Sequence, residues 1–417
     1  MGQLVNQFIP CLILAAIQFA LALPWLWTID PKTFREYSRR PSTWGVALGV
    51  VAGIALFGAF ILTYQRITSS LELAGRFYGS VLFIQIAVDS FLAAIYVMLK
   101  VWPKGGAVAL AAFREGVRQP MFWLIGLVAI AALMIATIFP YFTFGDDYKM
   151  MKQIGFDTTL LAGVIFGVIG ASMSINEEIE GRTAVTLMSK PVTRRQFLLG
   201  KFIGILLASW ALTLVIGWVL VWVLYFQPQF NPYDEVVDPM PRETLKILQP
   251  YFSKISSFDA TQAMTGLKQF EAGFLTWTSE ALSNGLGLIL GFGKVAVLLA
   301  IAATLATRMS MVSNLVLCLA IFFLGHLAPV LRRVSEELKS QSPDNTAISL
   351  VNFLTQLMET FTPALEYFNM GPAIIRDTPL SVTAFAQYVA SVVAYSGIYT
   401  VIALLFGLIL FEDRDLA

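Results

Sequence analysis

The sequence is poor in charge, in histidine and in cysteine. Only 13% of its 417 residues are Asp, Glu, Lys or Arg, about half the roughly 25% found in soluble domains. A net charge of +1 gives no basic bias of the kind that points to nucleic acid. The single histidine, His326, excludes a histidine-rich metal cluster within the chain. Cys11 and Cys318 both fall in apolar runs, so we expect neither a disulfide framework nor a thiolate metal site.

Apolar runs long enough to cross a bilayer are abundant instead. Hydrophobic residues make up 57% of the chain and the mean hydropathy is +0.72. The first run has no Lys or Arg before it, as a cleaved signal peptide would need, and is expected to be a retained helix. A bilayer core needs about 20 apolar residues per helix, and runs of that kind predict an all-α polytopic membrane protein with nine transmembrane helices. They lie at residues 5–27, 44–64, 77–101, 121–141, 156–176, 197–226, 281–307, 310–331 and 385–411.

Basic residues are concentrated in three of the segments that join these runs, at 28–43, 102–120 and 177–196. Because Lys and Arg are enriched in cytoplasmic loops, all three segments and the C-terminus are expected inside and the N-terminus outside. The opposite side then carries two large segments, 227–280 and 332–384. The second of these segments begins with Arg332 and Arg333, which the positive-inside rule would place in the cytoplasm. The acids Glu336 and Glu337 follow at once.

An amphipathic stretch in the second outer segment has leucines and a phenylalanine at helical spacing. It predicts a short helix lying on the outer membrane face or packing on the bundle, with a substrate-docking surface as the alternative. The positions are Leu350, Leu354, Leu357 and Phe361.

The densest polar segment is residues 177–196. Acids at its start are followed by Gly181, which permits a sharp turn, by an apolar-faced stretch TAVTLMS, and by Pro191, which cannot continue a helix. Thr193 and the glutamine three residues later have capping-box spacing, which predicts that a new helix starts there. These features favour a short helix parallel to the membrane that can dock on a cytoplasmic protein. On physical grounds alone, a solvated loop with positive-inside charges explains the segment equally well.

The string EEIEGRTAVTLMSKPVTRRQFLLGKFIG, residues 177–204, resembles the signature of ABC transporter permeases of the type-2 (ABC-2) exporter class. That signature has an acidic pair, a small turn residue and a threonine, then LLSKPVSR, an aromatic residue and GK. AFREGVRQPMFW, residues 112–123, resembles the elbow helix of the class. TPALEYFN, residues 362–369, resembles the outer segment before the last core span. LFEDRDLA, residues 410–417, resembles its ending, with Asp413 where a base is commoner.

The resemblance covers residues 104–417 and implies an elbow helix at 106–119 followed by six spans. Residues 1–103 add three spans, either as an accessory module or as the degenerate remainder of a second permease unit. We find no Walker A motif, the phosphate-binding loop of an ATPase, in the sequence. The nearest match, GLILGFGKV at residues 287–295, has the wrong spacing and lies within a span. The resemblance therefore implies a transport subunit rather than an enzyme, in the cytoplasmic membrane of a bacterium or archaeon. It also implies a separate pair of ATPase subunits that bind ATP and Mg²⁺, and a second permease chain in a homodimer or heterodimer.

Two sets of residues follow from this resemblance. The set implied in ATPase docking and coupling is Glu177, Glu178, Glu180, Gly181, Thr183, Leu187, Met188, Lys190, Pro191, Arg194 and Arg195. In the elbow helix, Leu110, Phe113 and Val117 form an apolar stripe, with Arg114, Glu115 and Arg118 opposite.

Two charges, Asp89 and Lys294, fall in the middle of apolar runs. Ionised groups at such depth are expensive and are usually paired or face water. We expect them to lie at similar depth and to form a structural pair. A second structural explanation is that the helix is placed so that the Lys294 side chain reaches outward from the apolar region. The alternative is that Asp89 and Lys294 belong to a substrate or proton pathway. The chain would then be a secondary transporter or channel instead of an ABC permease. An intramembrane enzyme ranks last, because no paired catalytic motif is visible.

Overall fold

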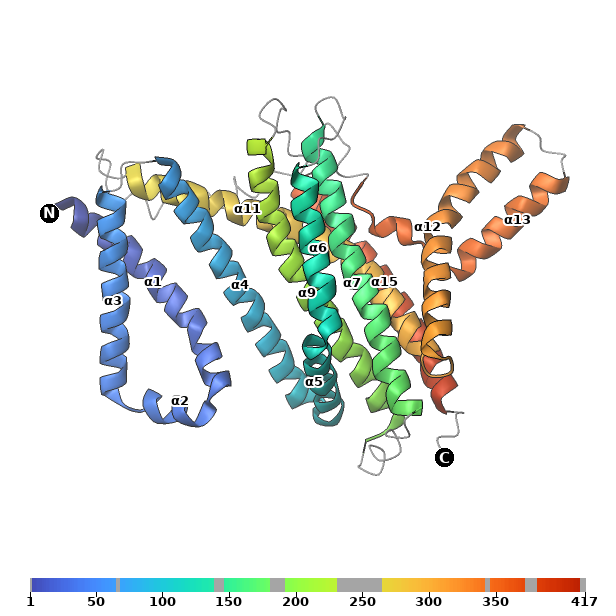
Figure 1. Cartoon of the computed structure of the whole chain (residues 1–417), viewed down its shortest axis with the longest axis horizontal. Coiled ribbons are helices and arrows are strands. Elements are labelled where there is room, and N and C mark those ends of the chain that lie inside the picture. The colour runs from blue at the N-terminus through green and yellow to red at the C-terminus, as the bar shows by residue number, and fades with distance from the viewer. Residues whose placement is uncertain are drawn as a thin grey trace. The chain divides into compact units, whose positions relative to one another are not determined.

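The computed structural model describes residues 2–64, 68–138, 146–180, 192–230, 265–341, 346–371 and 381–412. Within these ranges the secondary structure is helical, as expected for segments that must satisfy every backbone polar group inside a bilayer. The chain divides into two compact units (Figure 1). The first comprises Met1–Met98 and Arg242–Ser283, and the second comprises Leu99–Pro241 and Asn284–Ala417. The first unit thus contains the three spans that the sequence places in 1–103 and adds a stretch before the seventh span.

The predicted spans are confirmed in place. Eight of the described helices are long and apolar enough to cross a membrane, and each coincides with one predicted run. The remaining run forms two helical segments, Met311–Leu327 and Val330–Leu338, bent by 43° from one another, which make a ninth span if counted together. The chain is therefore an all-α, multi-pass membrane protein. Its orientation in the membrane stays a prediction.

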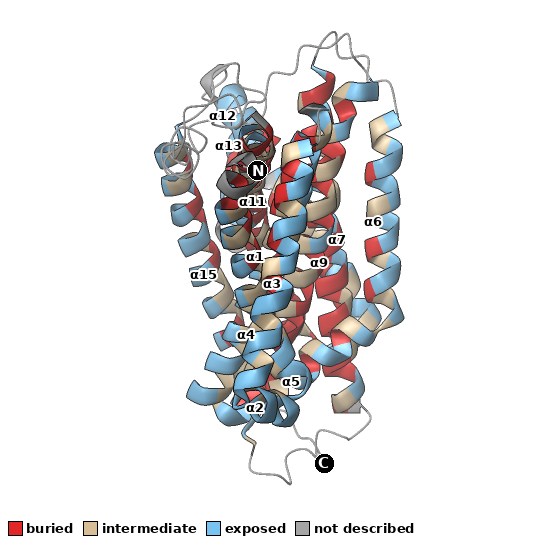
Figure 2. Ribbon diagram, turned by 90° about the vertical axis from the view of Figure 1, so that its left-hand side faces the viewer, coloured by how far each residue is buried: buried red, intermediate tan, exposed pale blue. Residues whose placement is uncertain are grey.

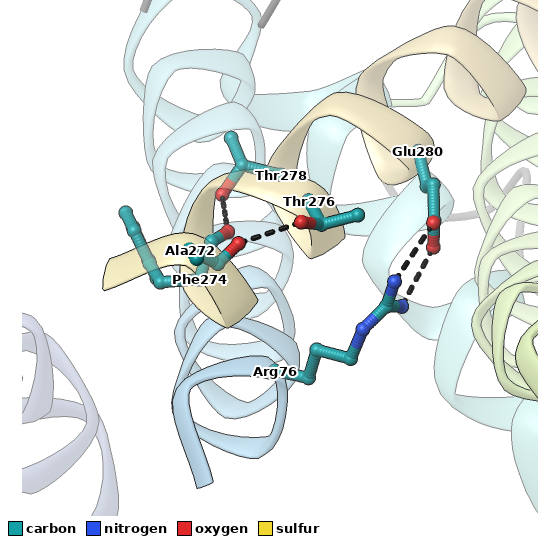
Figure 3. A network of polar contacts seen from close by, with 6 residues as sticks. All are labelled: Arg76, Ala272, Phe274, Thr276, Thr278 and Glu280. Atoms are coloured by element: carbon teal, nitrogen blue, oxygen red, sulfur yellow. Dashed lines mark hydrogen bonds and ion pairs between the residues drawn. The ribbon is translucent and has the colours of Figure 1, made fainter. Parts of the chain in front are cut away.

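The first unit is built from α1 (Gly2–Ile29), α2 (Pro31–Ser38), α3 (Pro41–Tyr64), most of α4 (Thr68–Val101) and the first part of α11 (Thr265–Leu305). Helices α1 and α3 pack together and are joined by the short α2. A second contact joins α4 to α11, where a Cβ at Gly75 would lie 1.9 Å from the carbonyl oxygen of Phe270. Beside that crossing, Arg76 makes a two-pronged ion pair with Glu280, with N–O distances of 2.8 and 3.0 Å (Figure 3).

The second unit holds the most buried helices. It comprises α5 (Pro103–Arg118), α6 (Pro120–Ile138), α7 (Asp147–Glu180), α9 (Arg194–Phe230), the rest of α11, α12 (Met311–Gln341), α13 (Thr346–Phe361), the 3₁₀ turn η2 (Leu365–Phe368) and α15 (Val382–Glu412). Buried residues are concentrated along α7 and α9 (Figure 2). Helix α9 packs against both α5 and α7, so the elbow and two spans share one core.

The outer segment after α12 is ordered by specific contacts. Leu365 and Phe368 in η2 are fully buried, which fixes the TPALEYFN segment against the core. The two arginines that break the charge rule are neutralised: Arg332 pairs with Glu336 at 2.8 Å and Arg333 with Glu366 at 2.9 Å. These local pairs explain why the charge rule fails there without changing the predicted topology.

Helix α13 confirms the predicted helix, and it packs on the bundle through the face opposite its apolar stripe. Asn352 and Thr355 are buried, and α13 packs along α12. Leu350, Leu354 and Leu357 are instead exposed. Periodicity predicted the helix correctly, but it could not tell which of the two faces packs on the protein.

Candidate functional site

The start of α9 forms as the sequence predicts. The Thr193 hydroxyl accepts a hydrogen bond from the backbone N–H of Gln196 at 3.2 Å, and the Gln196 side chain accepts one from the Thr193 N–H at 3.1 Å. This reciprocal pair is a capping box, and α9 begins at Arg194. The end of the polar segment is therefore held firmly in position.

Much of the predicted docking set lies outside the described residues. This holds for Gly181, Thr183, Leu187, Met188, Lys190 and Pro191. On the near side, α7 continues to Glu180, with Glu177 exposed in its last turn. The two helices that flank this segment, α7 and α9, are thus the described part of the site.

Lys201 joins three helices beside the end of α7. Its side chain is only 5% exposed, and its ammonium lies 2.6 Å from a Glu178 oxygen on α7 and 3.2 Å from a Glu115 oxygen on α5. It also donates a hydrogen bond to the Ser174 hydroxyl at 2.9 Å. A buried charge is tolerated only when it is paired and hydrogen-bonded, so these groups form one unit. We call Lys201, Glu178, Glu115 and Ser174 the Lys201 junction.

The elbow helix contacts α9 through small residues. A Cβ at Gly200 would lie 2.8 Å from the Val108 Cβ, and one at Gly204 would lie 2.3 Å from the Ala109 carbonyl oxygen. Close approach of this kind is what small residues spaced four apart permit between membrane helices. The buried face of α5 consists of Gly105, Gly106, Ala109, Ala112 and Gly116.

That face lies beside the predicted elbow stripe. Phe113 and Val117 are only half-buried, against the core of the second unit. Leu110 is half-buried as well, while Arg114 and Arg118 are exposed as predicted. Sequence reasoning missed the glycine and alanine face because these residues carry little hydrophobic signal, although they allow the backbones to approach most closely.

A second polar contact joins α9 to α15. The Arg194 guanidinium donates to the backbone carbonyls of Phe411 at 2.8 Å and Glu412 at 2.7 Å, and lies over the Phe411 ring. The turn after α11 contributes Arg308, which donates to the Leu410 carbonyl at 2.8 Å. Cations at the C-terminal end of a helix satisfy its free carbonyls and favour its dipole. Arg194, a member of the predicted docking set, therefore binds the end of α15.

The two intramembrane charges each have a partner in their own unit. Asp89 accepts a hydrogen bond from the Trp25 indole at 2.8 Å. Lys294 lies 3.2 Å from Nε2 of His326, whose Nδ1 lies 2.8 Å from the Phe322 carbonyl. That carbonyl can only accept, so Nδ1 carries the hydrogen and Nε2 accepts from the lysine. The reason for pairing Asp89 with Lys294 therefore no longer holds.

One further charge at membrane depth was missed. Asp157 on α7 is exposed, and it lies close enough to Lys294 and His326 to interact with them electrostatically. It makes no hydrogen bond or ion pair with any residue that the structure describes. In the sequence, Asp157 lies at the start of a predicted span, where a charged residue does not stand out from the adjoining polar segment. Its neighbours on other helices can be identified only from the structure.

Sequence reasoning also missed the Lys201 junction as a unit. Lys201 was noted as part of the GK signature, and Glu115 and Glu178 were assigned to separate segments. The available signal was the lysine itself, because a cation within an apolar run needs an acid from another helix. The described parts of the chain hold no group of three or more His, Cys, Asp or Glu residues that could bind a metal.

A comparison with known families gave a match to this part of the chain. Residues 117–248 match the family model described as ABC-2 family transporter protein. A comparison with curated proteins found no match. The family match spans α6, α7 and α9, including Glu178 and Lys201, and it confirms the resemblance to ABC-2 permeases.

Proposed function

We propose, from the match of residues 117–248 to the ABC-2 family transporter model, that the chain couples ATP hydrolysis by a separate subunit to export of a substrate. The segment 181–191 is the docking point for a cytoplasmic ATPase. Two such ATPases bind ATP and Mg²⁺, and two permease chains, identical or different, enclose the substrate path in the cytoplasmic membrane of a bacterium or archaeon. Catalysis belongs to the ATPases and not to this chain.

The observation that carries this proposal is the Lys201 junction. Glu178 lies just before the docking segment and Lys201 just after it, and their charged groups are 2.6 Å apart. A force applied between them therefore reaches α7 and α9 together. Glu115 adds the elbow helix to the same point. A solvated connecting loop would not require a buried ion pair to join its two ends.

The packing around this junction suits the transmission of movement. Gly200 and Gly204 flank Lys201 on α9 and hold α5 at backbone contact distance. Interiors packed this closely have low compressibility and transmit strain. A displacement of the docking segment would thus move α5, α7 and α9 as one body.

The Arg194 contact extends the same body to the last span. Arg194 is the first residue of α9 and holds the final carbonyls of α15. Docking at one short segment can in this way reach the last span as well as the elbow. We propose that this is how a single contact with the ATPase moves much of the permease core.

The experiment that tests the proposal is co-purification of the permease with its ATPase subunit, together with ATPase activity in membranes. Leu187→Asp places a charge on the apolar face predicted for the docking helix. It should release the ATPase while the permease remains folded in the membrane. The control must not place a charge on a membrane span, as Val312→Asp would. Thr346→Asp, on the outer segment, is the matched control and should leave binding unchanged. Normal binding and activity in Leu187→Asp would show that the segment is only a connector.

A second candidate function is a secondary transporter. It is favoured by Asp157, an exposed carboxylate on a membrane-spanning helix beside Lys294 and His326. Ionisable residues at such positions often mark substrate or ion paths. Transport by the chain alone in proteoliposomes, driven by an ion gradient and lost in Asp157→Asn, would support this function against the first.

A further inference from the structure

The N-terminal unit contains an apolar cavity that its own side chains leave unfilled. It has a volume of about 340 Å³ and lies between α1, α2 and α3. Phe19, Leu23 and Leu26 line it from α1, Phe34 lines it from α2, and Trp44 lines it from α3. A water molecule in a cavity needs two or more polar partners, and this lining is almost wholly apolar. The cavity therefore suits a hydrocarbon chain better than water.

The cavity has a fixed frame. Asp30 caps α2, accepting hydrogen bonds from the backbone N–H groups of Lys32 and Thr33 at 3.1 Å and from the Thr33 hydroxyl at 2.6 Å. The bonds from Thr33 hold the pKa of Asp30 below its ordinary value, so the cap stays ionised at neutral pH. At the other end, the Trp44 indole donates to the Ser38 carbonyl at 2.8 Å.

Helix α2 is held by these end contacts and not by packing. None of its residues is buried, even though Phe34 and Tyr37 point toward the cavity. The Trp44 ring meets Phe19 edge-on at 6.5 Å between centroids, which fixes α3 against α1 on the other side. The space beneath α2 is thus a built feature of the unit.

The opposite face of α2 is basic. Lys32, Arg35 and Arg39 are exposed on it, and they make no ion pair with any described residue. The acid on this face, Glu36, pairs with Arg40. Amphipathic helices of this kind lie in the membrane interface with their basic face among lipid phosphates. The positive-inside rule places this loop on the cytoplasmic face, where anionic lipids are recognised by such clusters.

We infer that this cavity is a binding site for one anionic phospholipid. An acyl chain occupies the space between α1, α2 and α3, and the head group passes the edge of α2 so that its phosphate meets the basic face that carries Lys32 and Arg35. The apolar lining selects the chain, and the excess of basic over acidic residues on α2 selects an anionic head group over a zwitterionic one, even though the Asp30 carboxylate lies at the start of the helix. The lipid completes the packing of α2, which has no buried residue of its own. This site lies outside the matched family region and does not depend on the proposed coupling.

The test is native mass spectrometry of the full chain, purified in mild detergent and supplied with equimolar phosphatidylglycerol and phosphatidylcholine of matched chains. One phosphatidylglycerol should remain bound per chain after collisional activation, in preference to phosphatidylcholine. Ala47→Trp fills the cavity from α3 and should abolish retention. Val46→Trp, at the next residue, which is 68% exposed, is the matched control and should retain the lipid.

Charge variants test the head group independently of the cavity variant. Each of Lys32→Gln and Arg35→Gln should lower the ratio of bound phosphatidylglycerol to phosphatidylcholine about fivefold, as expected when one basic residue near an anionic surface is lost. Lys100→Gln, in the last turn of α4, should leave the ratio unchanged. Equal retention of both lipids by the unaltered chain would overturn the inference, as would equal loss in the two Trp variants. If Ala47→Trp fails to fold, the charge variants alone decide.

Discussion

Two cations about two turns apart on α9, Lys201 and Arg194, connect its inner end in different ways. Lys201 is buried and binds the carboxylates of Glu178 and Glu115. Arg194 lies at the boundary of the core and binds backbone carbonyls at the end of α15. A buried ammonium without partners is a severe cost, whereas carbonyls at a helix end can turn to water. The comparison indicates that Lys201 is required for the fold around the docking segment, and that Arg194 only fixes its attachment to α15.

Replacing the buried cation should have the largest effect. Lys201→Met leaves the Glu178 carboxylate half-buried without its cation, and breaking a buried pair in this way costs about 3 to 5 kcal/mol. The apparent melting temperature of the purified chain, followed by fluorescence-detected size exclusion, should fall strongly. Lys201→Arg keeps the charge and should lose less. A melting temperature equal to that of the unaltered chain would contradict a structural role for this charge.

The glycine crossing beside Lys201 should come next. Gly204→Ala places a methyl group against the Ala109 carbonyl of the elbow helix, and overpacking of this kind costs about 1 to 3 kcal/mol. Gly397→Ala, on α15 where a Cβ would meet nothing within 4 Å, is the matched control. It should be neutral or slightly stabilising, because alanine favours helix. Equal melting temperatures for the two variants would show that the elbow does not approach α9 this closely.

Arg194 should contribute less than either. Arg194→Gln removes a cation from the end of α15, which is worth about 0.3 to 2 kcal/mol. The neighbouring Arg195 is 71% exposed and lies 3.8 Å from Glu412, so Arg195→Gln should change the same melting temperature little. Hydrogen exchange of the last turn of α15 should speed up in the first variant and not in the second. The opposite order would assign the contact to the wrong arginine.

The smallest effect is expected at the third arm of the Lys201 junction. The Glu115 side chain is 44% exposed, so solvent screens its ion pair and Glu115→Gln should cost less than about 1 kcal/mol. Glu178→Gln, at 23% exposure and 2.6 Å, should cost more. If Glu115→Gln proved the more damaging of the two, the elbow and not α7 would be the principal partner of Lys201.

The sequence predicted the local features of this molecule well. Apolar run length predicted every span, and capping-box spacing predicted the first residue of α9, because both depend on neighbouring residues. It predicted less about faces. The buried side of α13 is polar, at Asn352 and Thr355, and the buried side of α5 is glycine and alanine. Periodicity finds a stripe, but packing against a second helix decides which stripe is covered.

Long-range partners were the hardest to predict. Lys294 was assigned to Asp89 because these charges stood out in apolar runs, yet its hydrogen-bond partner is His326. Likewise, Glu115, Glu178 and Lys201 belong to three separate helices, and nothing in their spacing shows that they meet. The prediction that the docking segment is a short helix concerns residues 181–191, outside the described part of the chain.

Exchange of the two charges in the Lys201 junction tests the central claim most directly. Lys201→Glu and Glu178→Lys are made singly and together, and ATPase activity in membranes is measured alongside co-purification of the ATPase. Each single variant should lose both retention of the ATPase and its coupled activity, because the fold around the docking segment depends on this pair, and the double variant should recover part of both, because the pair is restored in reverse. Full activity in either single variant, or no recovery in the double variant, would contradict the account.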